Sequence, residues 1–174
     1  RGHMQVAVGV GIQLLWHLGA TVPIGGAYVL PKFFFSTPLD VAGRVCDSGP
    51  DAWIANDNAP GQVVIAGTPE GVEAAAERAR ALGVRRVMPL DVGHAFHTPL
   101  LAEAAEELHH LLATLDFREP SAPIVSNTDA LGHTDPACWP DQLTRHLVEP
   151  VRWRESQRSL AASAEQRVTE TGVL

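Results

Sequence analysis

Residues 52–66 read AWIANDNAPGQVVIA, two short apolar runs on either side of a polar stretch. The runs at 52–56 and 62–66 contain Trp, Ile and Val, which favour strands. Between them, residues 57–61 supply Asp, Asn, Pro and Gly, each of which favours a turn. We therefore predict a β-hairpin with its strands at 52–56 and 62–66 and its turn at 57–61.

A helix is predicted on each side of this hairpin. Thr37 and Pro38 provide a cap and a first-turn proline for a short helix that ends near Cys46. Thr68 caps a longer helix over residues 69–82, which are rich in alanine and in charged side chains. The hairpin therefore lies between two helices.

Further strands are predicted within residues 6–18 and over residues 85–91. The order is then strand, helix, strand, strand, helix, strand, which is the split βαβ pattern of a ferredoxin-like subdomain with both helices on one face. We place this small subdomain at residues 10–91, of which residues 12–36 are atypical and residues 19–37 have no clear period. The run at 33–35, three phenylalanines, is interpreted either as a buried strand or as an exposed patch.

The pattern changes after residue 91, so residues 92–174 are predicted to form a second part of the chain. An amphipathic helix is expected over 99–115 and a short buried strand over 123–127. Another helix is expected from residue 136 to about 147, and a last one that ends near residue 162. From the split βαβ pattern, the small lobe is predicted to be α+β.

Composition limits the classes of function. The chain has 174 residues, 45% of them hydrophobic, and a formal net charge of −7, which argues against nucleic acid and anionic membrane surfaces as partners. The two cysteines are far apart, so neither a disulfide scaffold nor a metal site is expected. No apolar run reaches the ~18 residues that a transmembrane helix needs. We expect a cytoplasmic protein.

Residues 94–97 read HAFH, between the strand predicted at 85–91 and the next helix. A histidine at such a junction can act as a general base, because imidazole titrates near neutral pH. His97 is therefore the first catalytic candidate, and the alternative is a capping or core histidine. A metal site made by His94, His97 and Asp91 is a weaker alternative.

Three other sets of residues are candidates. Asn58 and Gln62 either donate hydrogen bonds into a cleft or serve only the hairpin turn. Arg1 either holds a carboxylate through two hydrogen bonds or lies solvated at the chain end. Ser126 is a candidate nucleophile. It is a weak one, because it does not lie in a Gly-x-Ser-x-Gly elbow and the sequence contains none.

Several stretches together resemble the malonyl-CoA:acyl carrier protein transacylase family. They are Arg1-Gly2, the run NAPGQVVIAG at 58–67, HAFHTPL at 94–100 and PVRWRES at 150–156. Acyltransferase domains of polyketide synthases look similar. The resemblance covers residues 38–170, in the order that the family has.

The resemblance implies a hydrolase-like α/β core into which a ferredoxin-like lobe is inserted, this chain being the C-terminal portion. In the family, a serine attacks the thioester of malonyl-CoA, and the histidine that matches His97 takes its proton. The malonyl group then passes to the phosphopantetheine thiol of acyl carrier protein, a step of fatty acid biosynthesis. By resemblance, Arg1 grips the malonyl carboxylate and Asn58 and Gln62 lie by the cleft. Phe96 crowds a branched acyl group, and no cofactor is needed beyond the coenzyme A thioester.

The family's serine elbow lies upstream of its Arg-Gly motif, and this chain starts at that motif. We therefore expect the chain to be inactive alone, and to self-associate through an uncovered sheet edge. Three alternatives stay open. They are a polyketide synthase acyltransferase, a malonyl-transferring subunit of a malonate decarboxylase, and a non-catalytic fragment that binds a carrier protein.

Overall fold

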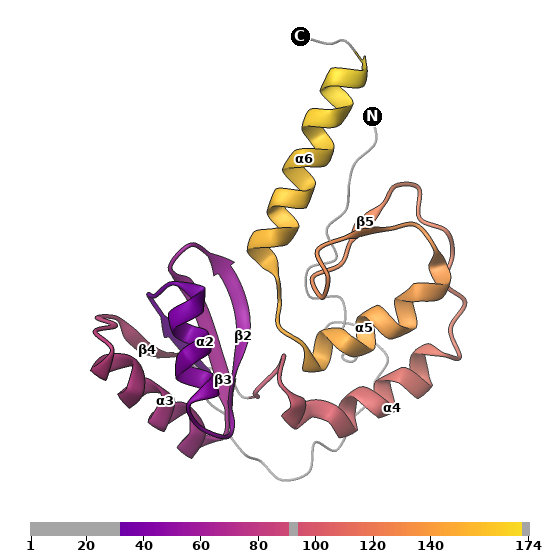
Figure 1. Ribbon diagram of the computed structural model, residues 1–174. Helices are drawn as coiled ribbons and strands as arrows, with labels where there is room; N and C mark the ends of the chain where they lie inside the picture. Colours follow the sequence, from indigo (N-terminus) through magenta and orange to yellow (C-terminus); the bar gives the residue numbers. More distant parts are fainter. Residues whose placement is uncertain (1–31, 91–93, 172–174) are drawn as a thin grey trace.

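The computed structural model describes residues 32–90 and 94–171 (Figure 1). Arg1, Asp91 and the strand expected within residues 6–18 lie outside the described residues. The assignment of residues 10–91 and 92–174 to separate parts stays a prediction. None of the described helices is long and apolar enough to cross a membrane.

A four-stranded antiparallel sheet forms the first part of the described chain, in the order β2-β3-β1-β4. Helices α2 and α3 pack on one face of it (Figure 1). The elements are β1 (Lys32–Phe35), α2 (Leu39–Asp47), β2 (Ala52–Ala59), β3 (Gln62–Gly67), α3 (Pro69–Ala81) and β4 (Val87–Leu90). This is the ferredoxin-like split βαβ arrangement, so the predicted fold class is confirmed for the small lobe.

The first strand of this sheet is the phenylalanine run, for which the sequence left two interpretations. β1 lies between β3 and β4, and Phe33 and Phe35 are 8% and 0% exposed among the residues packed under α2 and α3. A central strand has neighbours on both edges and both faces, which is why its sequence is apolar without alternation. The split βαβ pattern is complete without the strand expected within residues 6–18.

The predicted hairpin forms, but its turn is shorter than expected. β2 continues to Ala59, and the turn falls at residues 60–61, where Gly61 has a φ of 75°. β2 continues through its polar residues because the edge that does not pair with β3 forms hydrogen bonds with Val151. The N–H of Asp57 donates to the carbonyl of Val151 at 2.9 Å, and the N–H of Val151 donates to the carbonyl of Ala55 at 2.8 Å.

One of the two predicted helix caps is present. Thr68 accepts a hydrogen bond from the N–H of Gly71 at 3.0 Å, at the start of α3. Thr37 was wrongly predicted as a cap, since α2 begins at Leu39 after Pro38 without a side-chain cap hydrogen bond. Thr37 is instead buried.

The second part of the described chain is mainly helical. The predicted helix over 99–115 starts as a 3₁₀ turn and ends earlier, and the last helix runs beyond residue 162. The buried strand expected at 123–127 covers two residues and pairs with a strand that the sequence analysis missed. The elements are η1 (Pro99–Leu101), α4 (Ala102–Leu112), β5 (Ile124–Val125), β6 (Gly132–His133), η2 (Pro136–Cys138), α5 (Trp139–Val148) and α6 (Trp153–Thr171).

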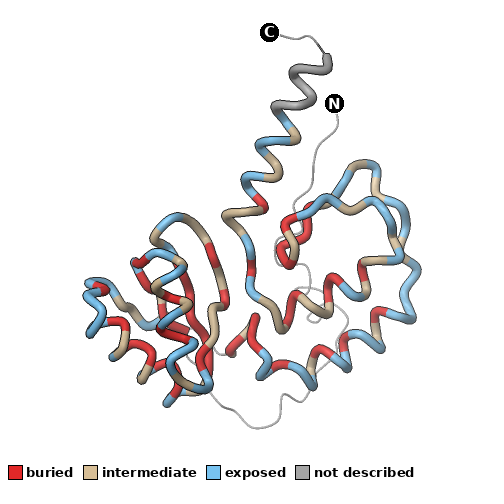
Figure 2. Tube along the Cα trace, viewed as in Figure 1, coloured by how far each residue is buried: buried red, intermediate tan, exposed pale blue. Residues whose placement is uncertain are grey.

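Helices α4 and α5 share an apolar core, and their buried positions face each other (Figure 2). Its buried members are Leu101, Ala105, Leu108, Leu112, Trp139, Leu143 and Leu147. The loop before η1 contacts the small sheet instead. Ala95 is fully buried against Ala55, Val64 and Ala66, so this loop lies on the sheet face opposite α2 and α3.

Gly67 gives a test of the close approach between the end of β3 and the start of β2. A Cβ atom at Gly67 would collide with the backbone carbonyl oxygen of Asp51, which also accepts the N–H of Thr68 at 2.9 Å. We predict that Gly67→Ala lowers the free energy of unfolding by ~1–3 kcal/mol. Urea denaturation monitored by circular dichroism measures it.

Gly43 provides the matched control. It lies inside α2, and a Cβ there has no neighbour within 4 Å. Gly43→Ala should therefore raise the stability by ~0.5–1 kcal/mol, through the lower backbone entropy of the unfolded chain. Equal denaturation midpoints for the two variants would contradict the close approach at Gly67.

Candidate active site

The backbone of His97 is held in a left-handed conformation, with a φ of 69°. This conformation costs a residue other than glycine ~1–2 kcal/mol. Its N–H donates to the carbonyl of Leu147 at 2.8 Å, which ties the turn to the end of α5. Strain of this kind is typical of functional positions, and here it fixes the direction of the imidazole.

The hydrogen bond of the ring defines its tautomer. Nδ1 of His97 lies 2.7 Å from the backbone carbonyl oxygen of His146. A carbonyl oxygen only accepts, so Nδ1 carries the proton and Nε2 keeps its lone pair. Within residues 32–90 and 94–171, Nε2 has no hydrogen-bond partner. The ring is therefore set up to accept a proton at Nε2.

Burial keeps this imidazole neutral. His97 is 8% exposed, and burial is the main reason why its pKa falls from 6.5 to about 3. His146 and the charge of Lys32 lower the pKa further, while the backbone hydrogen bond raises it. The ring of His146 lies 4.9 Å away, centroid to centroid, and its own pKa is lowered by burial. A general base must start unprotonated, and His97 meets that condition at neutral pH.

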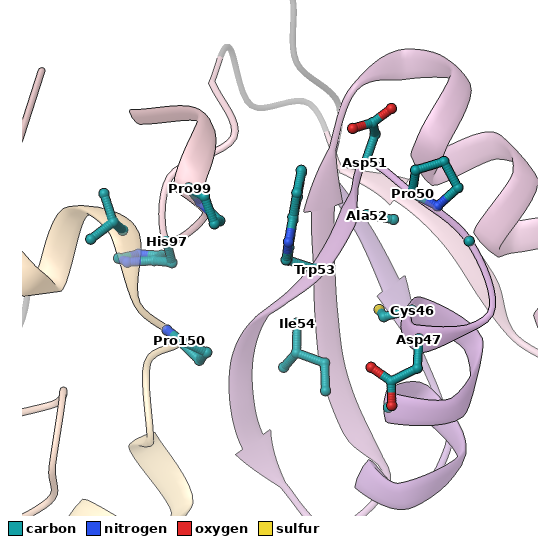
Figure 3. Close-up of a pocket in the computed structure, with 13 residues that line it drawn as sticks. Cys46, Asp47, Pro50, Asp51, Ala52, Trp53, Ile54, His97, Pro99 and Pro150 are labelled. Atoms are coloured by element: carbon teal, nitrogen blue, oxygen red, sulfur yellow. The ribbon is translucent and has the colours of Figure 1, made fainter. Parts of the chain in front are cut away.

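His97 borders a cavity of about 500 Å³ between the two parts of the molecule (Figure 3). Pro99 and Pro150 lie beside it, and Trp53 and Ile54 of β2 form the facing wall. The end of α2 and the residues after it complete the lining. His97 is thus buried, but it still borders this cavity.

Asn58 and Gln62 line a different cavity, of about 480 Å³. Carboxamide side chains dominate its lining, which consists of Asn56, Asn58, Ala59, Gln62, Asn127, Val151, Trp153 and Gln157. Asn56 was not predicted as a site residue, although the two-residue period of a strand places it on the same face as Asn58. Asn127 and Gln157 were not predicted either, since only the tertiary fold brings them to this place.

Phe96 is half-buried against the core shared by α4 and α5. Its ring lies 5.5 Å from that of His94, and the ammonium of Lys32 lies 5.7 Å from its centroid. Neither Asn58 nor Gln62 shares a cavity with Phe96 or His97 among the described residues. Lys32 could not be predicted as a neighbour of Phe96, because it lies in a stretch without a clear period.

Ser126 is not placed as a nucleophile. It is buried, and its hydroxyl donates to Oε1 of Gln142 at 2.9 Å and lies 2.6 Å from the hydroxyl of Thr128. No histidine hydrogen-bonds it in the described part of the chain, so nothing there would activate it. The same residues contain no group of three His, Cys, Asp or Glu side chains that could hold a metal ion. Asp91, the proposed third ligand, lies outside them.

The sequence profile of the family described as acyl transferase domain matches residues 40–172. The malonyl CoA-acyl carrier protein transacylase of Bacillus subtilis (strain 168) is 38% identical over 132 residues, which cover 76% of this chain and 42% of that protein. The chain thus spans about two fifths of the length of the curated relatives it matches.

Solved structures of malonyl transacylases also match the fold of this chain. The crystal structure of MCAT from Streptococcus pneumoniae matches with a TM-score of 0.80 and 31% identity, over 88% of this chain and 52% of that one. A structure of PlMCAT with AntF, described as a type II polyketide synthase acyl carrier protein in complex with its malonyl-transacylase, matches with a TM-score of 0.76. It is 29% identical, over 93% of this chain and 52% of that one.

The buried, neutral His97 makes stability depend on pH. The unfolded chain binds a proton at this residue below about pH 6.5, whereas the folded chain does so only near pH 3. Since the unfolded state then binds more protons, the free energy of unfolding falls as the pH drops below 6.5. The loss is at most ~1.4 kcal/mol per pH unit for each such histidine.

We predict that His97→Asn reduces this acid-dependent loss, because asparagine tolerates the left-handed backbone without titrating. Urea denaturation at pH values between about 7 and 5 measures it. His110→Asn is the control, since His110 is exposed on α4, and it should keep the acid profile of the parent chain. Identical slopes for His97→Asn and the parent would show that His97 is not held neutral by the fold.

Proposed function

The chain belongs to the acyl transferase domain family, and from that membership we propose that it forms the general-base part of a malonyl-CoA:acyl carrier protein transacylase. One observation carries the proposal. His97 has its Nδ1 bound to a backbone carbonyl and its Nε2 without a partner in the described residues, and burial keeps the ring neutral by lowering its pKa. This is the state that a base requires before it activates a hydroxyl nucleophile.

In the proposed reaction, Nε2 of His97 takes the proton of a serine hydroxyl as the serine oxygen attacks the thioester carbonyl. The carbon–sulfur bond breaks, and coenzyme A leaves as a thiol after it takes the proton back from His97. In the second half, His97 takes the proton of the phosphopantetheine thiol, whose sulfur attacks the carbonyl of the malonyl-serine ester. The ester carbon–oxygen bond breaks, and His97 returns the proton to the serine oxygen. The hydrogen bond to the carbonyl of His146 keeps the ring in the required tautomer through both halves.

The substrate and the partner are proposed by analogy with the relatives. The Bacillus subtilis relative is named for malonyl-CoA and acyl carrier protein, and the PlMCAT structure contains an acyl carrier protein. We propose the same pair here and fatty acid biosynthesis in the cytoplasm as the setting. Asn58 and Gln62, in the carboxamide-lined cavity, are proposed substrate contacts, and Phe96 is proposed to disfavour branched acyl groups. Arg1 is proposed to hold the malonyl carboxylate.

The nucleophile is proposed to come from a segment other than these 174 residues. The sequence contains no Gly-x-Ser-x-Gly elbow, and the hydroxyl of Ser126 is engaged by Gln142 and Thr128. The chain by itself would then contain the general base, His97, but not the serine hydroxyl that it deprotonates.

We predict that the chain alone, incubated with radiolabelled malonyl-CoA, retains no label after denaturing gel electrophoresis. Joining it to the part of the Bacillus subtilis relative that this chain does not cover should allow transfer of the label to acyl carrier protein. In that fusion, His97→Asn should slow transfer ~10²–10⁴-fold, the range for loss of a general base.

His110→Asn in the same fusion is the control, because it changes an exposed histidine of α4. A stable malonyl adduct on the chain alone would refute the proposal that the nucleophile lies elsewhere. An active fusion in which His97→Asn transfers at the parent rate would refute the role of His97.

A polyketide synthase acyltransferase is the second candidate. The observation in its favour is the match to PlMCAT, which is described with a carrier protein of a type II polyketide synthase. The chemistry and the role of His97 would be the same, and only the carrier protein would differ. Competition between a fatty acid carrier protein and a polyketide carrier protein for the label distinguishes the two candidates.

A further inference from the structure

The side chain of His146 has a ring nitrogen without a partner. The residue is 9% exposed, and its Nε2 is buried and makes no hydrogen bond within residues 32–90 and 94–171. Polar atoms of buried side chains are nearly always hydrogen-bonded, so this nitrogen calls for an explanation. The backbone carbonyl of His146 already holds His97, but that contact does not use the imidazole of His146. The imidazole is therefore available for another interaction.

The rings of His146 and His97 have the spacing of a metal-binding pair. Their centroids are 4.9 Å apart and their planes are tilted by 49°. Two imidazoles that share one zinc ion, with Zn–N bonds of ~2.0–2.1 Å at a tetrahedral angle, have centroids roughly 5 Å apart. Imidazole is also a ligand that zinc and related divalent ions favour. The spacing therefore fits a metal ion between the two rings.

His97 also has the hydrogen bonding of a histidine that binds a metal. Its Nδ1 donates to a backbone carbonyl oxygen at 2.7 Å, which leaves the lone pair of Nε2 free. Metal-binding histidines almost always donate their other ring N–H in this way, because the bond fixes the tautomer and orients the ring. With Nε2 of His146 as the second ligand, water would complete the tetrahedral set that zinc prefers.

The cavity beside His97 offers a path for a cation. Its lining includes the exposed carboxylates of Asp47 and Asp51, and contains no lysine or arginine among the described residues. Figure 3 shows both acids on the side of the cavity across from His97. A cleft lined by charges of one sign raises the local concentration of the opposite ion. The approach to His97 therefore favours a cation.

We propose that Nε2 of His97 and Nε2 of His146 together bind a divalent ion of the zinc type. The ion would occupy the lone pair with which His97 accepts a proton, so it would inhibit the proposed transfer reversibly and would not be a cofactor. This consequence rests on the proposed function, whereas the metal site itself does not. The site also differs from the one considered from the sequence, because His146, 49 residues away along the chain, replaces His94 and Asp91.

Calorimetric titration of the chain with Zn²⁺ tests the site. The parent chain should bind Zn²⁺ in a saturable way. His146→Gln removes one ligand and keeps the backbone carbonyl that holds His97, and it should weaken binding at least ~10-fold. His97→Asn should weaken binding as much. His110→Asn is the control, since it removes an exposed histidine of α4, and it should bind like the parent. Circular dichroism checks that the variants fold, and parent-like binding by His146→Gln would overturn the proposal.

NMR of the parent chain with ¹⁵N-labelled histidine gives a measurement that does not depend on the fold of a variant. Zn²⁺ should shift the Nε2 signals of His97 and His146 together, because both nitrogens become ligands. The Nδ1 signal of His97 should keep the position of a protonated nitrogen, because the carbonyl still holds that proton. A shift confined to other histidines, or to only one of the pair, would contradict the shared site.

The outcome is independent of the transfer assay. If the fusion transfers label but Zn²⁺ leaves the signals of His97 and His146 in place, the inference fails and the proposed function stands. If Zn²⁺ shifts both signals but the fusion transfers no label, the metal site stands and the proposed function fails.

Discussion

The end of α5 and the extended segment after it connect the two parts of the molecule through backbone hydrogen bonds. The carbonyls of His146 and Leu147 hold the ring and the N–H of His97. A few residues on, Val151 pairs with the edge of β2 through two hydrogen bonds. Pro150 links these two sets of contacts, because the residue before a proline is driven out of the helical region. Glu149 accordingly has an extended conformation, with φ −108° and ψ 154°, so α5 ends and the chain becomes available as a partner for the sheet edge.

This arrangement places the candidate base by main-chain contacts rather than by side chains, and neighbouring interactions hold it there. The carboxylate of Asp57, itself buried in β2, lies 2.7 Å from the guanidinium of Arg154 in α6. The contact is a close ion pair without an aligned hydrogen bond, so its main effect is to keep β2 and α6 together. The apolar core of α4 and α5 supplies the larger stabilisation, and it offsets the strained backbone of His97.

Local sequence patterns predicted the parts of the fold that depend on local physics. The hairpin and the Thr68 cap follow from turn residues and a capping hydroxyl, whereas the catalytic role of His97 stays a prediction. The rest depended on contacts remote in sequence. β2 extends through three polar residues because Val151 pairs with its edge. β6 forms after Ala130 adopts a φ of 60°, a conformation that no local signal for alanine predicts. The carboxamide-lined cavity joins residues from three separate elements.

The same burial has opposite consequences for the two ionisable groups beside Phe96. It lowers the pKa of both, but the imidazole starts at 6.5 and falls to about 3, while the ammonium starts at 10.5 and falls to about 8. At neutral pH the first is therefore an uncharged proton acceptor and the second is still a cation. The positive charge of Lys32 further favours the neutral form of His97.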